Sequence, residues 1–337
     1  MAWNFKSAEP YLIAEIGGNH EGDFEYAKKL THLACESGVN AVKFQIYTGD
    51  SLVSPIENPI RNQHFKKFEL TPAQHIELAQ ICNSYNVEYN ASVWDISAIE
   101  WIDPYLSFYK IGSGDFTAYP VLRKIVDTKK PILLSTGLST LEEIKATVDY
   151  IINLDASYNN PDMLAILQCT SMYPIPISEA NLNVMATFNN HFNATIGYSD
   201  HTEGDFAVKT AIVMGAKILE MHFTDSREGK EFRDHKVSFT KEEIIYLKKY
   251  ISDVHVVTGS TIKEPTNSEK ESDHVLTFRR ATYLNRDIKE GEIILEADLV
   301  VLRPNKGIDA RDYYSVIGKK SNRDIKAFEH LKWSYFD

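Results

Sequence analysis

Two short apolar runs of the chain end in polar side chains that a purely packing strand does not need. They read ATIGYSDHT at residues 194–202 and KILEMHFT at residues 217–224. Successive side chains of a strand point to opposite faces, so Ser199 and His201 share one face of the first run. Glu220 and His222 share one face of the second run in the same way. Imidazole is a common metal ligand, so two histidines at matching ends of neighbouring parallel strands can share one divalent ion; the alternative is two unrelated histidines bonded to loop carbonyls.

Eight apolar or β-branched runs have the length expected of buried strands. They cover residues 11–17, 40–46, 87–94, 108–114, 131–137, 163–170, 194–202 and 217–224. Helical patterns alternate with them, at residues 23–37, 71–85 and 241–257 and also from Tyr119, Thr140 and Glu179 onward. Eight such repeats over about 250 residues predict a closed (β/α)₈ barrel. An open doubly wound sheet is the alternative, but GGNHEG at residues 17–22 lacks the GxGxxG turn expected there.

The carboxyl ends of the predicted strands carry the side chains that could form a site. In a (β/α)₈ barrel these ends gather at one face. Here they carry Glu15, Asn19, His20, Lys43, Gln45, Trp94, Asp95, Lys110, Ser113, Asp115, Ser135, Thr136, Thr170, Ser171, Ser199, Asp200, His201, Glu220 and His222. Lys43 and Lys110 interrupt apolar strands, which is costly unless each ammonium meets an anion. The pattern therefore predicts a pocket that binds an anionic substrate.

Composition narrows the class of protein. With 337 residues and 43% hydrophobic residues, the chain can form one large domain and a small one. The formal net charge of −11, without a basic cluster, argues against a nucleic-acid partner. No run has the length of a signal peptide or a membrane helix, so we expect a cytoplasmic protein with no membrane association. Cys35, Cys82 and Cys169 show no metal or redox spacing, and Cys169 ends a strand near the predicted site.

The sequence changes character after Gly259. Residues 260–273 read STIKEPTNSEKESD, which is typical of a polar linker. From residue 278 to the end, short alternating runs around turns indicate a β-rich module of about 60 residues, which is marginally stable alone. We therefore expect a barrel domain at residues 1–259, a linker at 260–275 and a small domain at 276–337.

Seven motifs resemble those of the sialic acid synthases and their nonulosonic acid synthase relatives. They are AEIGGNHEGD at residues 14–23, VKFQ at 42–45, YKIGSGD at 109–115, LLSTGLS at 133–139, QCTSMYPIP at 168–176, GYSDHT at 197–202 and EMHFT at 220–224. Residues 278–337, with LNRDIKEGEIILEADLVVLRPNKGI at 284–308, resemble the antifreeze-protein-like (SAF) domain that follows the barrel in that family. The resemblance covers nearly the whole chain, in the order of the family.

This resemblance implies a condensation of phosphoenolpyruvate with an N-acylated mannose-type sugar. The sugar would be N-acetylmannosamine or a 2,4-diacylamido-6-deoxyhexose, and the product a nine-carbon 2-keto acid such as N-acetylneuraminate, with phosphate released by C–O cleavage. His201 and His222 match the family's metal ligands, which implies a divalent ion, Mn²⁺ with Mg²⁺ or Co²⁺ as alternatives, that polarises the sugar aldehyde. The family also implies a domain-swapped homodimer in which Arg303 reaches the sugar of the other subunit.

Matching positions give each predicted site residue a role. The catalytic set is Glu15, Lys43, Gln45 and Lys110, with Glu15 as the acid that exchanges a proton with the sugar hydroxyl or the attacking water. The alternative for Glu15 is a structural role as the partner of a buried lysine. The phosphoenolpyruvate set is Lys43, Lys110, Ser113, Ser135, Ser171 and Ser199. The sugar set is Asp115, Tyr173, Asp234 and Arg303.

Departures from the family fall on the sugar side. Asp115 stands where many sialic acid synthases carry glutamate, and Ser171 where they often carry asparagine. Asn305 replaces a glycine of the usual RPGxG turn, and FRDH at residues 232–235 replaces a Gly-Pro-Asp-His run.

Two other functions remain open from the sequence. One is another phosphoenolpyruvate–aldose condensation that makes an eight-carbon keto acid on a similar barrel. The other is an inactive barrel whose C-terminal module binds a carbohydrate or a protein.

Overall fold

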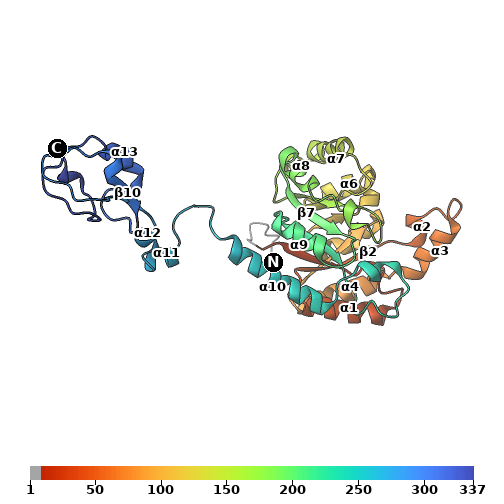
Figure 1. Cartoon of the computed structure of the whole chain (residues 1–337). Coiled ribbons are helices and arrows are strands. Elements are labelled where there is room, and N and C mark those ends of the chain that lie inside the picture. Colours follow the sequence, from red (N-terminus) through yellow and green to blue (C-terminus); the bar gives the residue numbers. More distant parts are fainter. Residues whose placement is uncertain (1–8) are drawn as a thin grey trace. The chain divides into compact units, whose positions relative to one another are not determined.

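A computed structural model describes residues 9–337. The chain divides into two compact units, Met1–Gly259 and Ser260–Asp337, which are coloured along the sequence in Figure 1. The boundary falls at the residue after which the sequence turns polar. Among the described residues, no helix is both long enough and apolar enough to cross a membrane.

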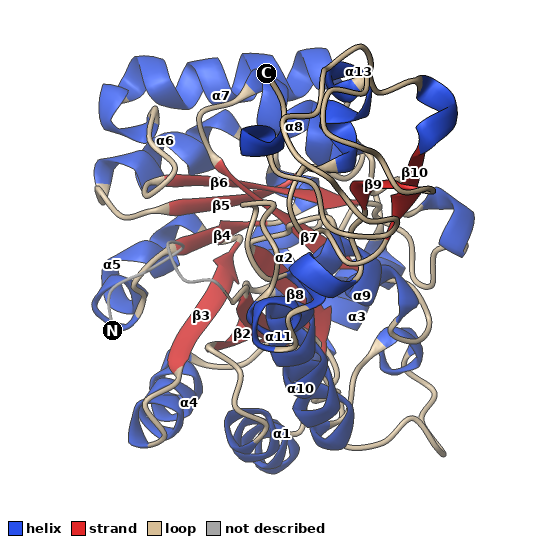
Figure 2. Ribbon diagram, turned by 60° about the vertical axis from the view of Figure 1, so that its left-hand side comes forward, coloured by secondary structure: helices blue, strands red, loops and turns tan. Residues whose placement is uncertain are grey.

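The first unit is a closed barrel of eight parallel strands, as the sequence predicts. The strands follow one another around the barrel in chain order, and β1 closes the sheet by pairing with β8. They are β1 (Tyr11–Glu15), β2 (Ala41–Ile46), β3 (Glu88–Val93), β4 (Tyr109–Ile111), β5 (Ile132–Ser135), β6 (Leu164–Cys169), β7 (Thr195–Asp200) and β8 (Ile218–His222). Figure 2 shows the strands at the centre with helices outside them. The closing register pairs Glu15 with His222, so the predicted acid and the predicted metal ligand lie at one height.

Helices cover the outside of the barrel. They are α1 (Phe24–Glu36), α4 (Pro72–Ser84), α5 (Ile99–Ile102), α6 (Tyr119–Asp127), α7 (Leu141–Leu154), α8 (Val184–His191), α9 (Phe206–Val213) and α10 (Lys241–Thr258). Capping boxes at Thr71, Thr140 and Thr240 fix where three of them begin. The helical pattern at Glu179 is split: a 3₁₀ turn ends at Glu179, Asn181 takes a left-handed conformation with φ 48°, and α8 follows.

Two further helices, α2 (Gly49–Leu52) and α3 (Pro59–Phe68), lie between β2 and α4 and are not predicted from the sequence. Only Asn62 and Phe68 of α3 are buried, so the helix lacks a regular apolar face. Asn62 ties the two helices together, because its side-chain amide donates to the carbonyls of Gly49 and Val53. This connection lies beside the predicted site.

The second unit contains a two-stranded antiparallel sheet, β9 (Ala281–Leu284) with β10 (Leu299–Leu302). Isolated bridges extend the pairing, and buried apolar side chains form a small core of its own: Leu284, Ile288, Ile294, Leu299, Ile308, Val316, Ile325 and Leu331. Within the alternating runs, residues 313–316 form the short helix α13 (Tyr313–Val316). The polar segment before the sheet includes the short helices α11 (Asn267–Glu271) and α12 (His274–Thr277).

The buried His75 predicts a stability loss in acid. Burial lowers its pKa to about 3, helped by neighbouring His20, and its Nδ1 lies 2.7 Å from the Tyr89 hydroxyl. Unfolded His75 takes up a proton below about pH 6.5, whereas folded His75 stays neutral. The contribution of neutral His75 to the unfolding free energy is therefore complete above pH 6.5 and is lost as the pH falls toward 3. We expect His75→Gln to flatten the decline in unfolding free energy between pH 6.5 and 5 by about 1 kcal/mol per pH unit. Urea unfolding at several pH values measures this, and equal slopes for both proteins would contradict it.

Candidate active site

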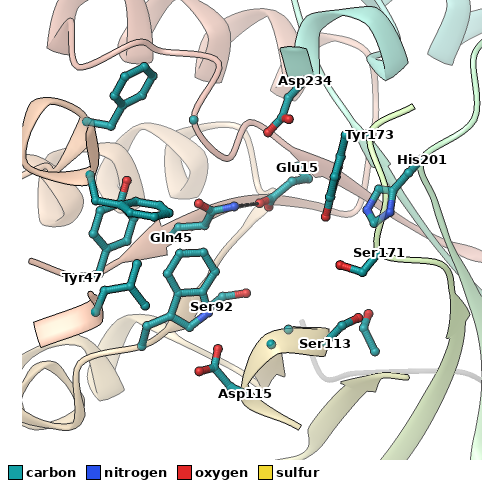
Figure 3. Close-up of a pocket in the computed structure, with 18 of the residues that line it drawn as sticks. Glu15, Gln45, Tyr47, Ser92, Ser113, Asp115, Ser171, Tyr173, His201 and Asp234 are labelled. Atoms are coloured by element: carbon teal, nitrogen blue, oxygen red, sulfur yellow. Dashed lines mark hydrogen bonds between the residues drawn. The ribbon is translucent and has the colours of Figure 1, made fainter. Parts of the chain in front are cut away.

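A cavity of about 1100 Å³ opens at the carboxyl ends of the strands. All first-unit residues that were given a role from the sequence line it: Glu15, Lys43, Gln45, Lys110, Ser113, Asp115, Ser135, Ser171, Tyr173, Ser199, His201, His222 and Asp234. Of the other predicted strand-end side chains, Trp94 and Glu220 also line it, whereas Asn19, His20, Asp95, Thr136, Thr170 and Asp200 are not among the lining residues. Figure 3 shows Glu15 and Gln45 near the middle, Tyr47 on one side and Tyr173 with His201 on the other. Arg303 belongs to the second unit, where it is exposed and its guanidinium lies 5.3 Å from the centre of the Phe278 ring.

A buried network of two lysines and two glutamates forms the floor of the cavity. Lys43 Nζ lies 2.6 Å from Glu15 Oε2 and 3.8 Å from Glu220 Oε2. Lys110 Nζ lies 3.2 Å from Glu220 Oε1. All four residues are at most 5% exposed, and Gln45 Nε2 donates to Glu15 Oε1 at 2.9 Å. The anions that the buried lysines require are therefore supplied in part by the protein itself.

Burial and the opposite charges move the pKa values of this network in different directions. Burial lowers the pKa of Lys110, and Glu220 only partly opposes this. Burial also disfavours charged Lys43, but two carboxylates outweigh it and raise its pKa. Burial raises the pKa of Glu15, with Lys43 opposing, whereas for Glu220 two lysines outweigh burial and lower the pKa. Glu15 is therefore the carboxyl of the network that accepts a proton more readily.

The two predicted metal ligands lie together, with ring centroids 5.4 Å apart. His201 Nδ1 lies 2.8 Å from the Thr170 carbonyl oxygen, which can only accept, so Nδ1 carries the proton and Nε2 keeps its lone pair. His222 Nδ1 is buried and has no hydrogen-bond partner among the described residues. Within residues 9–337 no three His, Cys, Asp or Glu side chains are grouped to hold a metal ion. The pair fits an ion that takes two ligands from the protein and the others from water or substrate.

The predicted serines line the cavity around the network. Ser199 Oγ donates to Glu220 Oε1 at 3.2 Å, and Ser135 Oγ is buried without a hydrogen-bond partner among the described residues. Cys169, whose position near the site the sequence indicated, also lines the cavity. Asp115 lines it as well, and burial raises the pKa of its carboxyl to about 6, with Lys110 opposing.

Several lining residues have no role assigned from the sequence, although Glu220 and Trp94 belong to the predicted strand-end set. Glu220 shares a strand face with His222, but its role as partner of both lysines depends on barrel closure. The others include Tyr47, Arg61, His64, Phe65, Phe68, Ser92, Trp94, Phe232 and Arg233. The signals that could have found them are the cluster of aromatic residues and histidine in α3 and the unusual FRDH run.

The fold and the site together define a (β/α)₈-barrel protein with a polar pocket of mixed charge at the carboxyl ends of its strands and a small appended domain. Comparison with protein families narrows this class. Residues 30–263 match the NeuB family and residues 279–336 match the SAF domain. The chain belongs to the NeuB family, which confirms the resemblance seen in the sequence.

Individual relatives align with this chain over nearly its full length. The chain is 33% identical to the N,N'-diacetyllegionaminic acid synthase of Legionella pneumophila, over 97% of this chain and 94% of the relative. It is 30% identical to a pseudaminic acid synthase of Campylobacter jejuni, over 97% and 96%. Among solved structures, the sialic acid synthetase of Leptospira borgpetersenii, in complex with citrate, superposes with a TM-score of 0.72 at 26% identity, covering 80% of this chain and 92% of that one.

Removing Glu220 tests the network. Glu220→Gln leaves two buried lysines with a single carboxylate, so we expect the unfolding free energy to fall by about 3–5 kcal/mol. The double variant Lys110→Met/Glu220→Gln removes the uncompensated ammonium as well and should be more stable than Glu220→Gln alone. Urea unfolding of the wild type, both single variants and the double variant measures the coupling. Strictly additive effects would show that the two side chains do not interact.

Proposed function

We propose that this protein is a nonulosonic acid synthase that condenses phosphoenolpyruvate with an acylamino sugar and releases phosphate. The observation that carries the proposal is the paired lysine–glutamate network beside two histidines, in the barrel of a NeuB-family chain. The names of the relatives support it, since they are legionaminic and pseudaminic acid synthases. The arrangement fits the reaction better than it fits an inactive barrel, because burying four charged side chains carries a desolvation penalty that a barrel without a charged substrate has no need to bear.

The reaction joins three molecules and releases one. Carbon 3 of phosphoenolpyruvate attacks the sugar aldehyde, carbon 2 gains positive character and takes up water, and the tetrahedral intermediate loses phosphate to give the keto acid. Lys43 and Lys110 offer charge to the phosphate and carboxylate of phosphoenolpyruvate. The hydroxyls of Ser113, Ser135 and Ser199, which line the same cavity, add further donors.

Glu15 suits the proton transfers. Its carboxyl is buried, its pKa is raised by that burial, and Gln45 holds one oxygen while Lys43 contacts the other. A carboxyl held in this way can exchange a proton with the attacking water or with the new sugar hydroxyl. Gln45 and Lys43 fix its orientation.

His201 and His222 would hold a divalent ion, which we propose to be Mn²⁺, with Mg²⁺ or Co²⁺ as alternatives. When bound, the ion supplies Lewis-acid polarisation of the sugar carbonyl. The Thr170 carbonyl fixes the tautomer of His201, and the Tyr173 ring, 4.0 Å from His201 and 5.5 Å from His222 between centroids, restricts both imidazoles.

We also propose a homodimer in which Arg303 of one copy serves the acceptor sugar of the other. The proposal rests on the family resemblance and on the exposure of Arg303. The cytoplasmic location stays a prediction from the sequence.

Phosphate release from phosphoenolpyruvate with Mn²⁺ tests the proposed function. The acceptors are N-acetylmannosamine, 2,4-diacetamido-2,4,6-trideoxymannose, the corresponding altrose derivative, arabinose 5-phosphate, and no sugar. We expect release with at least one acylamino sugar and none without an acceptor. Release with the phosphorylated pentose alone would assign the eight-carbon reaction, and silence across the panel with Mn²⁺ bound would favour the binding-module alternative.

Replacing either histidine tests the metal assignment. His201→Ala and His222→Ala should each reduce Mn²⁺-dependent phosphate release by about 100-fold or more, since Lewis-acid stabilisation is worth several kcal/mol. Both variants should bind Mn²⁺ more weakly by titration calorimetry while keeping the circular dichroism of the wild type. The exposed His191→Ala serves as the matched control. Near-normal turnover after metal depletion in both variants would refute the assignment.

A further inference from the structure

Three aromatic side chains form one wall of the cavity, apart from the charged floor. His64 and Phe68 come from α3, and Phe232 comes from the connection after β8. Ring centroids lie 4.5 Å apart for His64 and Phe68, 5.1 Å for Phe68 and Phe232, and 6.2 Å for His64 and Phe232. All three line the cavity. We call this set the aromatic wall.

Gly18 leaves the space that Phe232 fills. A Cβ placed at Gly18 would lie 2.9 Å from Phe232 Cζ and 3.5 Å from Phe68 Cδ1. The first distance is shorter than any normal contact, so a side chain at this position would push the Phe232 ring away. The backbone of Gly18 does not lie in the left-handed region, so alanine is allowed there on conformational grounds.

A buried carboxylate borders the aromatic wall. Asp234 is 6% exposed, lies two residues after Phe232, and receives a 3.2 Å contact from Arg233 Nε. In Figure 3 its carboxylate points into the space shared with Glu15 and Tyr173. The cavity therefore offers a hydrogen-bond acceptor next to an apolar surface. A substituent that joins an N–H or O–H donor to a neighbouring methyl group matches this pair.

The charges at this side of the cavity do not favour a phosphorylated sugar. Arg61 and Arg233 line it, but so do Glu57, Glu231 and Asp234. Burial and the cations nearby, Arg233 first among them, lower the pKa of His64. The ring is therefore neutral at pH 7 and adds apolar surface, not charge.

We propose that Phe232, supported by His64 and Phe68, is a specificity residue that selects an acceptor sugar with a methyl-bearing substituent beside the group held by Asp234. The chemical class is a 2,4-diacylamido-6-deoxyhexose. N-acetylmannosamine has the same acetamido group at carbon 2, so the discrimination is at carbons 4 and 6, where the preferred sugar has an acylamino group and a methyl and N-acetylmannosamine has hydroxyls. This inference rests on the proposed function. A hydroxyl placed against the rings would lose water without gaining a partner, and a pocket of this kind discriminates about 10- to 200-fold.

The experiment compares kcat/KM for 2,4-diacetamido-2,4,6-trideoxymannose, N-acetylmannosamine and N-acetylmannosamine 6-phosphate, with Mn²⁺ and saturating phosphoenolpyruvate. We expect the wild type to prefer the trideoxy sugar by about 10-fold or more. Phe232→Ala should reduce that ratio about 10-fold, mainly through the acceptor KM, and leave the KM for phosphoenolpyruvate unchanged. Gly18→Ala should shift the ratio in the same direction by displacing the ring. Phe206→Ala, which alters a ring that is 69% exposed on α9, is the matched control.

Three outcomes would overturn the inference. An equal loss on both sugars in Phe232→Ala would mean that the ring only supports the fold. An unchanged ratio would mean that the wall does not contact the acceptor. A wild-type preference for N-acetylmannosamine 6-phosphate would mean that the cations dominate.

Calorimetric binding of the two sugars to the Mn²⁺-loaded protein, without phosphoenolpyruvate, separates this inference from the proposed function. Tighter binding of the trideoxy sugar that Phe232→Ala abolishes would support the aromatic wall even if no acceptor released phosphate. Equal affinity for both sugars in the wild type would refute the wall even if the synthase reaction were observed.

Discussion

Four buried charged side chains form ion pairs that link the candidate site to the closure of the barrel. Lys43 lies on β2, Lys110 on β4, Glu15 on β1 and Glu220 on β8, and none is more than 5% exposed. A buried ammonium without its carboxylate is strongly destabilising, so each strand needs the others in register. Only the closed sheet supplies that register, since Glu220 reaches both lysines after β8 has returned to β1. The ion pairs that Glu220 makes in the pocket therefore form only when the barrel closes, and they in turn stabilise the closed barrel.

Much of this arrangement could be predicted from the sequence, because strand alternation is a local property. The eight strands appear as short continuous apolar runs followed by polar residues, and the shared face of Glu220 and His222 follows from a period of two. Glu15 as the partner of a buried lysine is one of the alternatives that the sequence leaves open, and Lys43 is that lysine. The role of Glu220 as partner of both Lys43 and Lys110 could not be predicted, because it depends on which strands close the barrel. The helix α3 escaped prediction for a similar reason: Asn62, fixed by carbonyls of another segment, replaces the apolar face that a pattern would reveal.

The histidine pair, too, can be predicted in part from the sequence and depends in part on the three-dimensional structure. Alternation places His201 and His222 at the ends of adjacent strands, and the structure brings their rings together. The sequence has no close spacing that would mark a metal site, because two ligands on separate strands leave no local motif. Their orientation depends on groups outside both strands, the Thr170 carbonyl and the Tyr173 ring. Strand alternation leaves two interpretations open, a shared metal ion or two unrelated histidines, and the family resemblance favours the metal ion.

The charged residues and the aromatic residues of the cavity come from different parts of the fold. The charged groups sit on strands, which hold them rigidly, whereas the aromatic wall comes from connections, which vary more freely among relatives. Gly17 and Gly18 join the two. A Cβ at Gly17 would lie 3.0 Å from Glu15 Oε1 and 3.2 Å from Gln45 Nε2, and one at Gly18 would press on Phe232. Gly17 has φ of 52°, a backbone conformation that glycine adopts at little cost. At both positions, a side chain would have to displace its neighbours. The same two residues thus limit the space for both the Glu15 carboxyl and the Phe232 ring.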